Sequence, residues 1–193
     1  EAGNASLSLS SVSRARQYEW TRPILDLARD KQADFLRRSF QLPLAQVDSL
    51  RCEEVLDMPL PEMHIRASIT ALRYANKTGS LFVPVAPLRS GPGRFTAERR
   101  HDLWIDKGYC DTDSLTLHLP EGYVVEALPK SVTIENRFGK VAFEALCSGD
   151  RLHIRIRLLR RSGRYPQSEY AAFREFMQAV DRVYSAKIVL RKV

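Results

Sequence analysis

Cysteine is scarce in this sequence, and the few cysteines form no recognised pattern. The 193 residues contain three, Cys52, Cys110 and Cys147, an odd number with wide spacing. A disulfide framework uses an even set, and a structural zinc site uses pairs of ligands a few residues apart. We therefore expect free, partly buried thiols. Neither a disulfide scaffold nor a metal site is predicted.

Long apolar runs are also missing. No stretch approaches the roughly 20 apolar residues that a membrane-spanning helix needs, so no transmembrane segment is expected. The sequence has no internal repeat and no low-complexity segment. Hydrophobic residues make up 44% and charged residues 27%, which is typical of a globular chain rather than a disordered one. At this length the chain can form one large domain or two small ones.

The formal net charge is +7, and arginine is much commoner than lysine. Nucleic-acid-binding proteins gather such charge on one face and interleave it with exposed aromatic residues. Here the arginines are spread along the whole chain. The charge therefore indicates a solvated surface, and no nucleic-acid partner is predicted.

The strongest pattern is a series of strands and turns between Leu115 and Arg161. Its last run alternates perfectly, with Leu152, Ile154, Ile156 and Leu158 between Arg151, His153, Arg155 and Arg157. Such alternation predicts a strand with one face in the core and one in water. Short turns separate the runs, so the strands must be antiparallel. The pattern predicts a β meander.

Helical periodicity occurs near both ends of the chain. A helical pair is expected around residues 14–40, with Ser13 as a cap and Pro23 opening the second helix. A C-terminal helix over residues 168–184, capped by Ser168, carries the clearest apolar stripe. Its stripe consists of Tyr170, Phe173, Phe176, Met177, Val180 and Tyr184.

The remaining strands complete a mainly β (α+β) fold. Strands are expected at residues 5–12, 50–56, 63–74, 80–86 and 186–190, with residues 76–79 forming a hairpin loop. The long loop over residues 87–99 is the expected boundary. Residues 1–90 would be a linking segment with a short strand, the helical pair and β strands. Residues 91–193 would hold the antiparallel meander, the helix and the closing strand, and the two parts can form one compact unit. The predicted architecture is an antiparallel β-sandwich with a helical pair near the N-terminus and one C-terminal amphipathic helix.

Several motifs resemble a known family. They are Arg99 or Arg100, the run over residues 119–129 (LPEGYVVEALP), Asn136-Arg137-Phe138-Gly139, the Arg-rich strand, Tyr165-Pro166 through Tyr170 and Phe173, and the run over residues 187–190 (KIVL). Together they resemble the C-terminal β domain of unknown function in Gram-negative envelope proteins that carry a transglutaminase-like core. The resemblance covers about half the chain, and residues 1–90 fit the segment that joins core and domain more loosely.

The resemblance implies a non-catalytic accessory domain that is periplasmic or associated with the cell envelope. Its partner would be an upstream catalytic-like domain of the same protein or another envelope protein. In that family the catalytic Cys, His and Asp belong to the upstream domain. We accordingly predict that this chain is not an enzyme and contains no catalytic or cofactor-binding residues.

The enzymatic alternative would need a thiol at a helix N-terminus with a histidine within hydrogen-bond reach. Cys52 with His64 is one combination to test, although Cys52 lies in a predicted strand. Cys110 with His118 and Asp113 is the other, although Cys110 lies in a turn-like stretch. Neither thiol opens a helix, so bystander cysteines are favoured over a thiol hydrolase or transferase.

The outward row Arg151, Arg155 and Arg157 is the candidate binding face. One interpretation is that the row binds an anionic polymer or an acidic partner surface. The other is that it is an ordinary solvated face paired with acidic residues such as Glu144. His118 and His153 would be neighbours if their strands pair, but they lack a third metal ligand. Asp111-Thr112-Asp113 is interpreted as a turn rather than a calcium loop.

An alternative of a different class is an independent carbohydrate- or peptide-binding module. Three aromatic residues, Phe95, Trp104 and Tyr109, lie near the start of the predicted meander. An exposed rim formed by these three side chains would favour such a module.

Overall fold

The computed structural model of the chain describes all residues except 1–2, 41–43, 57–58, 87–94 and 96–97. Strands account for 51% of the residues, and several antiparallel sheets combine with three α-helices. The predicted mainly β, sandwich-type fold with a C-terminal helix is confirmed.

The chain divides into two compact units, an N-terminal unit of residues 1–77 and a C-terminal unit of residues 78–193. This division lies earlier than the boundary that the sequence suggested at residues 90 and 91. Most of the long loop on which that expectation rested lies outside the described residues.

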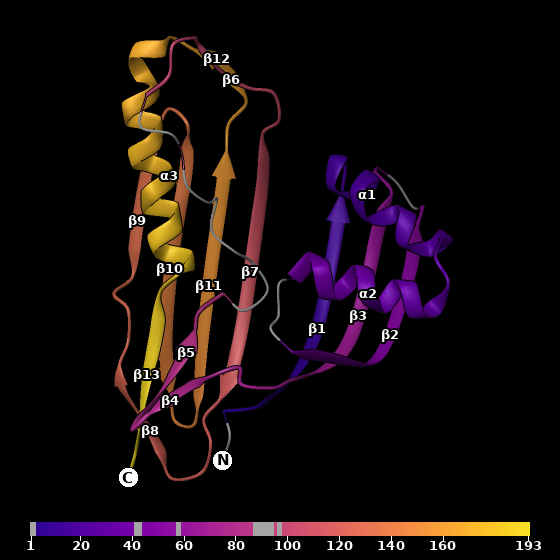
Figure 1. The fold of residues 1–193 in the computed structure, drawn as a ribbon, viewed down its shortest axis with the longest axis vertical. Coiled ribbons are helices and arrows are strands. Elements are labelled where there is room, and N and C mark those ends of the chain that lie inside the picture. The colour runs from indigo at the N-terminus through magenta and orange to yellow at the C-terminus, as the bar shows by residue number, and fades with distance from the viewer. Residues whose placement is uncertain (1–2, 41–43, 57–58, 87–94, 96–97) are drawn as a thin grey trace. The chain divides into compact units, whose positions relative to one another are not determined.

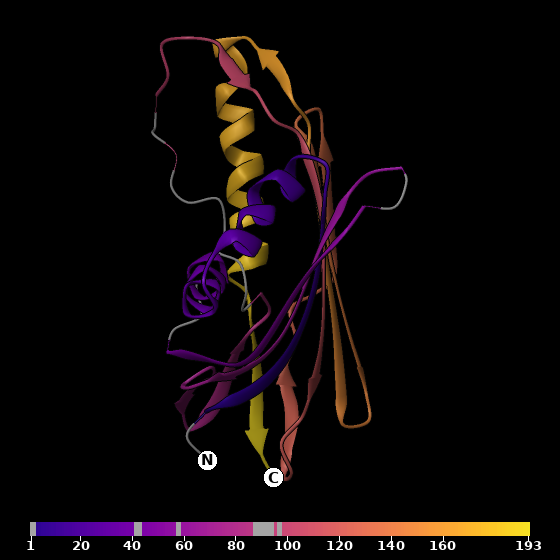
Figure 2. The same cartoon turned by 90° about the vertical axis from the view of Figure 1, so that its right-hand side faces the viewer.

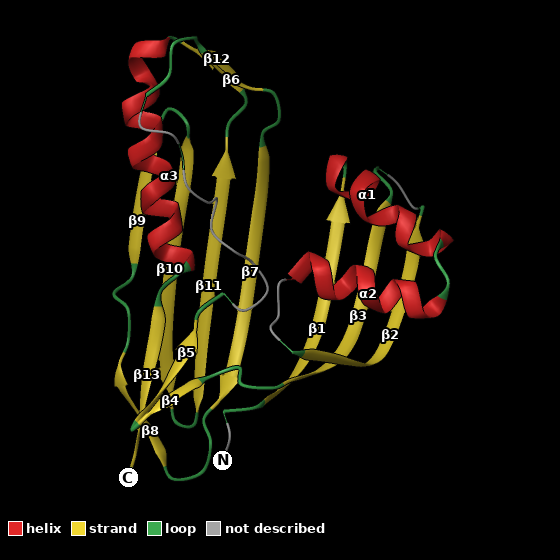
Figure 3. Ribbon diagram, viewed as in Figure 1, coloured by secondary structure: helices red, strands yellow, loops and turns green. Residues whose placement is uncertain are grey.

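The N-terminal unit is a three-stranded antiparallel sheet in the order β1-β3-β2. Figure 3 shows its helices gathered on one face of the sheet. The strands are β1 (Ala5–Arg14), β2 (Ala45–Val55) and β3 (Glu62–Ala71). The helices are α1 (Arg16–Thr21), the 3-10 helix η1 (Arg22–Asp26) and α2 (Arg29–Phe40). Leucines of β1 alternate with exposed serines, so one face of the strand is apolar.

The helical pair forms, but with different ends from those predicted. Ser13 is not a helix cap, because it is a buried residue of β1, and Ala15 at φ 49° precedes α1 instead. Pro23 opens only the 3-10 helix η1. Leu27 then adopts an extended conformation, which separates η1 from α2. The second helix is therefore split in two.

The C-terminal unit is built on a four-stranded antiparallel sheet in the order β7-β11-β10-β9 (Figure 1). Its strands are β7 (Tyr109–His118), β9 (Val132–Asn136), β10 (Gly139–Ser148) and β11 (Arg151–Arg160). Strand β11 pairs over its whole length with both β10 and β7. Its inward side chains, Leu152, Ile154, Ile156 and Leu158, are at most 5% exposed.

A second layer covers the inward face of this sheet. Helix α3 (Tyr170–Tyr184) lies along it in both Figure 1 and Figure 2, and β13 continues from the end of the helix. The helix buries the predicted aromatic stripe, with Phe173, Phe176 and Met177 at most 4% exposed. A further sheet has the order β4-β5-β13-β8. Its strands are β4 (Asn76–Thr78), β5 (Ser80–Pro84), β13 (Lys187–Lys192) and β8 (Tyr123–Ala127).

The prediction of a continuous meander is therefore only partly correct. Strands β9, β10 and β11 follow one another as expected, but β8 leaves this sheet and pairs with β13. The predicted hairpin around residues 76–79 is wrong, because β3 and β5 belong to different sheets. The predicted turn at residues 111–113 is also wrong, because those residues lie within β7 and pair with β11.

A short antiparallel ribbon lies beyond the end of the large sheet. The sequence patterns did not predict it. It consists of β6 (Leu103–Ile105) and β12 (Gly163–Tyr165). After β12 the 3-10 helix η2 (Gln167–Glu169) leads into α3. Ser168 makes no side-chain capping bond to the helix, so its predicted role as the N-cap is wrong.

Candidate functional site

The basic row lies on the outward face of the large sheet, along its inner strand β11. Arg151, Arg155 and Arg157 are all exposed, because they alternate with the buried residues of the same strand. The register places Ser114 opposite Arg155 and Thr112 opposite Arg157 on β7. A column of hydroxyl groups therefore runs beside the column of guanidinium groups.

On the other side of the row, Glu144 of β10 stands directly opposite Arg155, as the sequence suggested. No hydrogen bond or ion pair engages Arg155 or Arg157 within the described part of the chain. Arg151 has only a loose contact, with its Nε 4.0 Å from Asp150 Oδ1. The three guanidinium groups thus remain open to a partner.

The strands of His118 and His153 pair as expected, and the two histidines are diagonal neighbours on this face rather than directly opposite one another. His153 is opposite Thr116, and its Nδ1 lies 3.1 Å from the threonine Oγ1. His118 is opposite Arg151. Among the residues that the structure describes, no group of three His, Cys, Asp or Glu side chains could hold a metal ion.

Cys52 and His64 lie on opposite faces of the N-terminal sheet. Cys52 is paired with the buried Ile65, whereas His64 is paired with the exposed Glu53. Burial raises the pKa of the Cys52 thiol, and a catalytic thiol needs the opposite shift. His64 instead places its Nε2 2.7 Å from Glu62 Oε2.

Cys110, His118 and Asp113 are not brought together either. All three belong to β7, so Cys110 and His118 are eight residues apart along one extended strand, a separation of about 27 Å. Asp113 faces the other way, where Tyr184 donates to its Oδ2 at 3.5 Å. Cys147, the third thiol, is exposed beside the β10–β11 turn.

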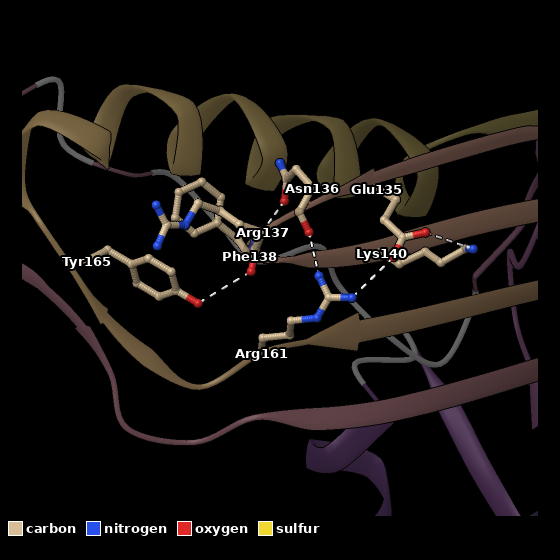
Figure 4. Close-up of polar contacts among 7 residues, drawn as sticks. All are labelled: Glu135, Asn136, Arg137, Phe138, Lys140, Arg161 and Tyr165. Carbon is tan, nitrogen blue, oxygen red and sulfur yellow. Dashed lines mark hydrogen bonds and ion pairs between the residues drawn. The ribbon is translucent and has the colours of Figure 1, made fainter.

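The turn between β9 and β10 forms a polar network that the sequence analysis did not identify (Figure 4). The backbone N–H of Phe138 donates to Asn136 Oδ1 at 2.9 Å, and Arg161 donates to the Asn136 carbonyl oxygen at 2.7 Å. Glu135 accepts from Arg161 at 3.2 Å and lies 3.0 Å from Lys140 Nζ. Hydrogen bonds from Lys140 and Arg161 lower the pKa of the Glu135 carboxyl group.

An aromatic cluster anchors the same turn in the core. Phe138 is 1% exposed, and its ring meets those of Tyr165 and Phe173 at centroid distances of 4.8 and 5.5 Å. Arg137 lies over the Tyr165 ring and pairs with Glu169 at 2.6 Å. These contacts join the turn to β12 and to the start of α3. The segment Asn136-Arg137-Phe138-Gly139 therefore stabilises the fold at this point.

The three aromatic residues proposed as an exposed rim do not form one. Phe95 packs its ring against Phe173 at 5.5 Å, and the Tyr109 ring lies under the Arg160 guanidinium at 4.5 Å. Trp104 alone among them is strongly exposed, at 72%.

A shallow hollow of about 300 Å³ lies in the N-terminal unit. It follows the cross-strand row Leu9, Ala67 and Leu50. The other residues around it are Ser8, Ser10, Ser49, Ser68, Arg29, Arg51 and Arg66. None of the lining residues is a histidine, a cysteine or an acid, so the hollow has no nucleophile–base pair.

Comparison with protein families identifies a match for the C-terminal unit. A family model described as "Domain of Unknown Function with solved-structure structure (DUF3858)" matches residues 79–190. The chain belongs to this family. The DUF3858 match covers more than half of the chain and nearly the whole C-terminal unit. No curated protein and no solved structure matches the chain. Within the described residues, no helix has the length and apolar character needed to span a membrane.

Proposed function

We propose that this DUF3858 chain is a non-catalytic accessory domain of a transglutaminase-like envelope protein of Gram-negative bacteria. It works in the periplasm or at the cell envelope, and its outward basic row contacts an acidic surface. That surface belongs to the catalytic-like domain upstream in the same protein or to another envelope protein. The observation that carries the proposal is the row of open guanidinium groups on β11.

Two further observations support a role without catalysis. The Asn136–Gly139 turn, which lies within the family match, is held by packing and turn contacts. In addition, the two thiol–histidine combinations suggested by the sequence are separated by a sheet or by the length of a strand.

The chemistry of the row favours an acidic protein surface. Alternate residues of a strand are about 6.8 Å apart, so Arg155 and Arg157 present a regular pair of planar donors. Guanidinium groups bind carboxylates through two parallel hydrogen bonds. Thr112 and Ser114 can add hydroxyl contacts from the adjacent strand. On the other side Glu144 is a single opposing charge.

The test uses the double variant Arg155→Glu with Arg157→Glu. A matched control, Arg191→Glu with Lys192→Glu, changes the net charge equally at two exposed positions of β13. Binding to the transglutaminase-like domain of the same protein, produced as a separate chain, is measured by calorimetry at low and high salt. We expect the row variant to weaken binding about tenfold or more at low salt and the control to change it little.

Two results would contradict the proposal in different ways. Equal weakening by both variants would show that only net charge matters and not the basic row. A native gene without any transglutaminase-like region, combined with no binding to such a domain, would remove the envelope-protein context.

A further inference from the structure

The ribbon of β6 and β12 has one buried and one exposed face. Leu103, Ile105 and Tyr165 are each 6% exposed and form its inner side. Trp104 and Arg164, which are directly opposite one another in the register, form its outer side. Trp104 is 72% exposed, and the Arg164 side chain is 79% exposed. Figure 1 shows this ribbon beyond the ends of β7 and β11.

Covering an indole with this exposure would be favourable. Burying a large aromatic side chain is worth a few kcal/mol, and tryptophan is common where one side of a contact is apolar and the other polar. No other ring stacks on Trp104, and no cation lies over it, in the part of the chain that the structure describes. Most of the indole surface is therefore available to a ligand.

Polar groups surround the indole on its own face of the ribbon. Asp102 and Asp106 alternate with the buried residues of β6 and are exposed, as is Ser162 before β12. Asp102 is held in place, because its Oδ1 accepts the Gln167 N–H at 3.2 Å and its Oδ2 lies 3.7 Å from Arg164 Nε. The patch therefore has one apolar platform ringed by carboxylate, guanidinium and hydroxyl groups.

We propose that this patch binds the pyranose ring of a glycan chain. The C–H face of the sugar lies on the Trp104 indole, and the ring hydroxyl groups bond to Arg164 and Asp102. The site goes beyond the proposed docking function, because it uses other residues on a separate ribbon.

The surroundings favour a sugar over a protein partner. Tryptophan and arginine are common at protein interfaces, but aspartate is depleted there, and hot-spot side chains lie within a ring of further contacts that excludes water. The neighbours of Trp104 on this face are instead charged or hydroxylic. A sugar ring has the matching composition, with one apolar face and a polar edge. A carboxylate has two acceptor oxygens and a guanidinium group has five N–H donors, so each can bond to two adjacent hydroxyl groups.

The platform is also rigid, which reduces the entropic cost of binding. The Tyr165 hydroxyl donates to the Arg137 carbonyl oxygen at 3.5 Å, and its ring packs on Phe138. Gln167 donates to the Arg99 carbonyl oxygen at 2.8 Å. The ribbon is thus tied to the turn of Figure 4 and to η2.

The experiment follows the two indole N–H signals of the full chain by NMR. The chain has two tryptophans, and Trp20, which is 53% exposed in the N-terminal unit, is an internal control. Cellotriose and chitotriose are titrated as neutral pyranose probes. Mannitol is titrated as a polyol without a ring, and a proline-rich peptide represents a protein partner.

We expect saturable shifts of the Trp104 signal with at least one trisaccharide, at dissociation constants of about 1 mM, and none with mannitol. Trp104→Ala should weaken binding, measured on the remaining backbone signals, about tenfold or more. Arg164→Ala should weaken it by a smaller factor, and Trp20→Phe should leave it unchanged. Thermal unfolding checks that each variant retains the fold.

Three results would overturn the inference. They are the absence of a saturable shift with both sugars, equal shifts at Trp20 and Trp104, and a response to the peptide alone. None of these results depends on the basic row of β11, so the docking proposal is tested separately.

Discussion

The two faces of strand β11 differ in almost every physical respect. Its inward residues are leucines and isoleucines at most 5% exposed, whereas its outward residues are arginines and a histidine in water. The inward face is held by α3 and by the aromatic cluster around Phe138. The outward face has few internal contacts. Packing therefore determines the residues of one face, whereas the residues of the other face lie in solvent.

The largest effect is expected on the inward side, from Phe173→Ala. Phe173 is 4% exposed and contacts the rings of Phe138, Phe95 and Tyr170. Emptying such a site costs about 3–5 kcal/mol of unfolding free energy. Urea unfolding should show this loss, whereas Gln178→Ala, at an exposed position of α3, should stay within about 0.5 kcal/mol. A loss under about 1 kcal/mol for Phe173→Ala would contradict the assigned packing.

A smaller loss is expected at Gly139, where β10 approaches β11 closely. A Cβ atom there would lie 2.0 Å from the Leu159 carbonyl oxygen, so the backbone must shift. Gly139→Ala should cost about 1–3 kcal/mol, as overpacking usually does. Gly149→Ala is the control, because its added Cβ meets nothing within 4 Å and only the φ of +60° is unfavourable. If the control were the more destabilising variant, the close approach would not be the cause.

The difference between buried and exposed positions can also be measured as the reactivity of the three cysteine thiols. Burial raises the pKa of Cys52, whereas Cys110 and Cys147 are exposed. Because the thiolate is the nucleophile, Cys52 should react with iodoacetamide more slowly than the other two near neutral pH. Peptide mapping of partly alkylated protein gives the three rates. A fast reaction at Cys52 with a pKa below the usual value of about 8.5 would point to an activated thiol.

The smallest effect on stability is expected from the outward face. Arg155→Glu with Arg157→Glu removes no ion pair within the described residues. The unfolding free energy should therefore change by no more than about 0.5 kcal/mol per site. Urea unfolding of this variant, compared with Phe173→Ala, measures the difference between the two faces directly. A loss of several kcal/mol would mean that the row is part of the packing.

The sequence predicted the features that depend on local periodicity. Alternation from Arg151 to Leu158 correctly assigned both faces of β11, and the aromatic stripe correctly placed α3 in the core. Features that depend on distant partners were missed. The composition of Asp111-Thr112-Asp113 is typical of a turn, but the ladder with β11 keeps it extended. Likewise β8 is short, and its place is decided by pairing with β13, some sixty residues later.

In the candidate sites, too, features set by local periodicity were predicted and features set by distant partners were not. The exposure of the basic row followed from alternation, and the separation of Cys52 from His64 followed only from the register of β2 and β3. The Trp104 patch depends on a ribbon whose strands are each three residues long. Strands of that length leave little periodic signal. The network of Asn136 and Arg161 joins residues from separate strands and could not be read from either segment alone.

The position of β13 has a consequence for how the protein is made. This strand lies between β5 and β8, and its Ile188 and Leu190 are at most 1% exposed. During synthesis β5 and β8 leave the ribosome long before the strand that separates them. Until residues 187–192 emerge, both strands have an unpaired edge that can join another nascent chain. The sheet of β4, β5, β13 and β8 therefore cannot close until residues 187–192 have been made, and a chaperone would be of most use to this unit during that interval.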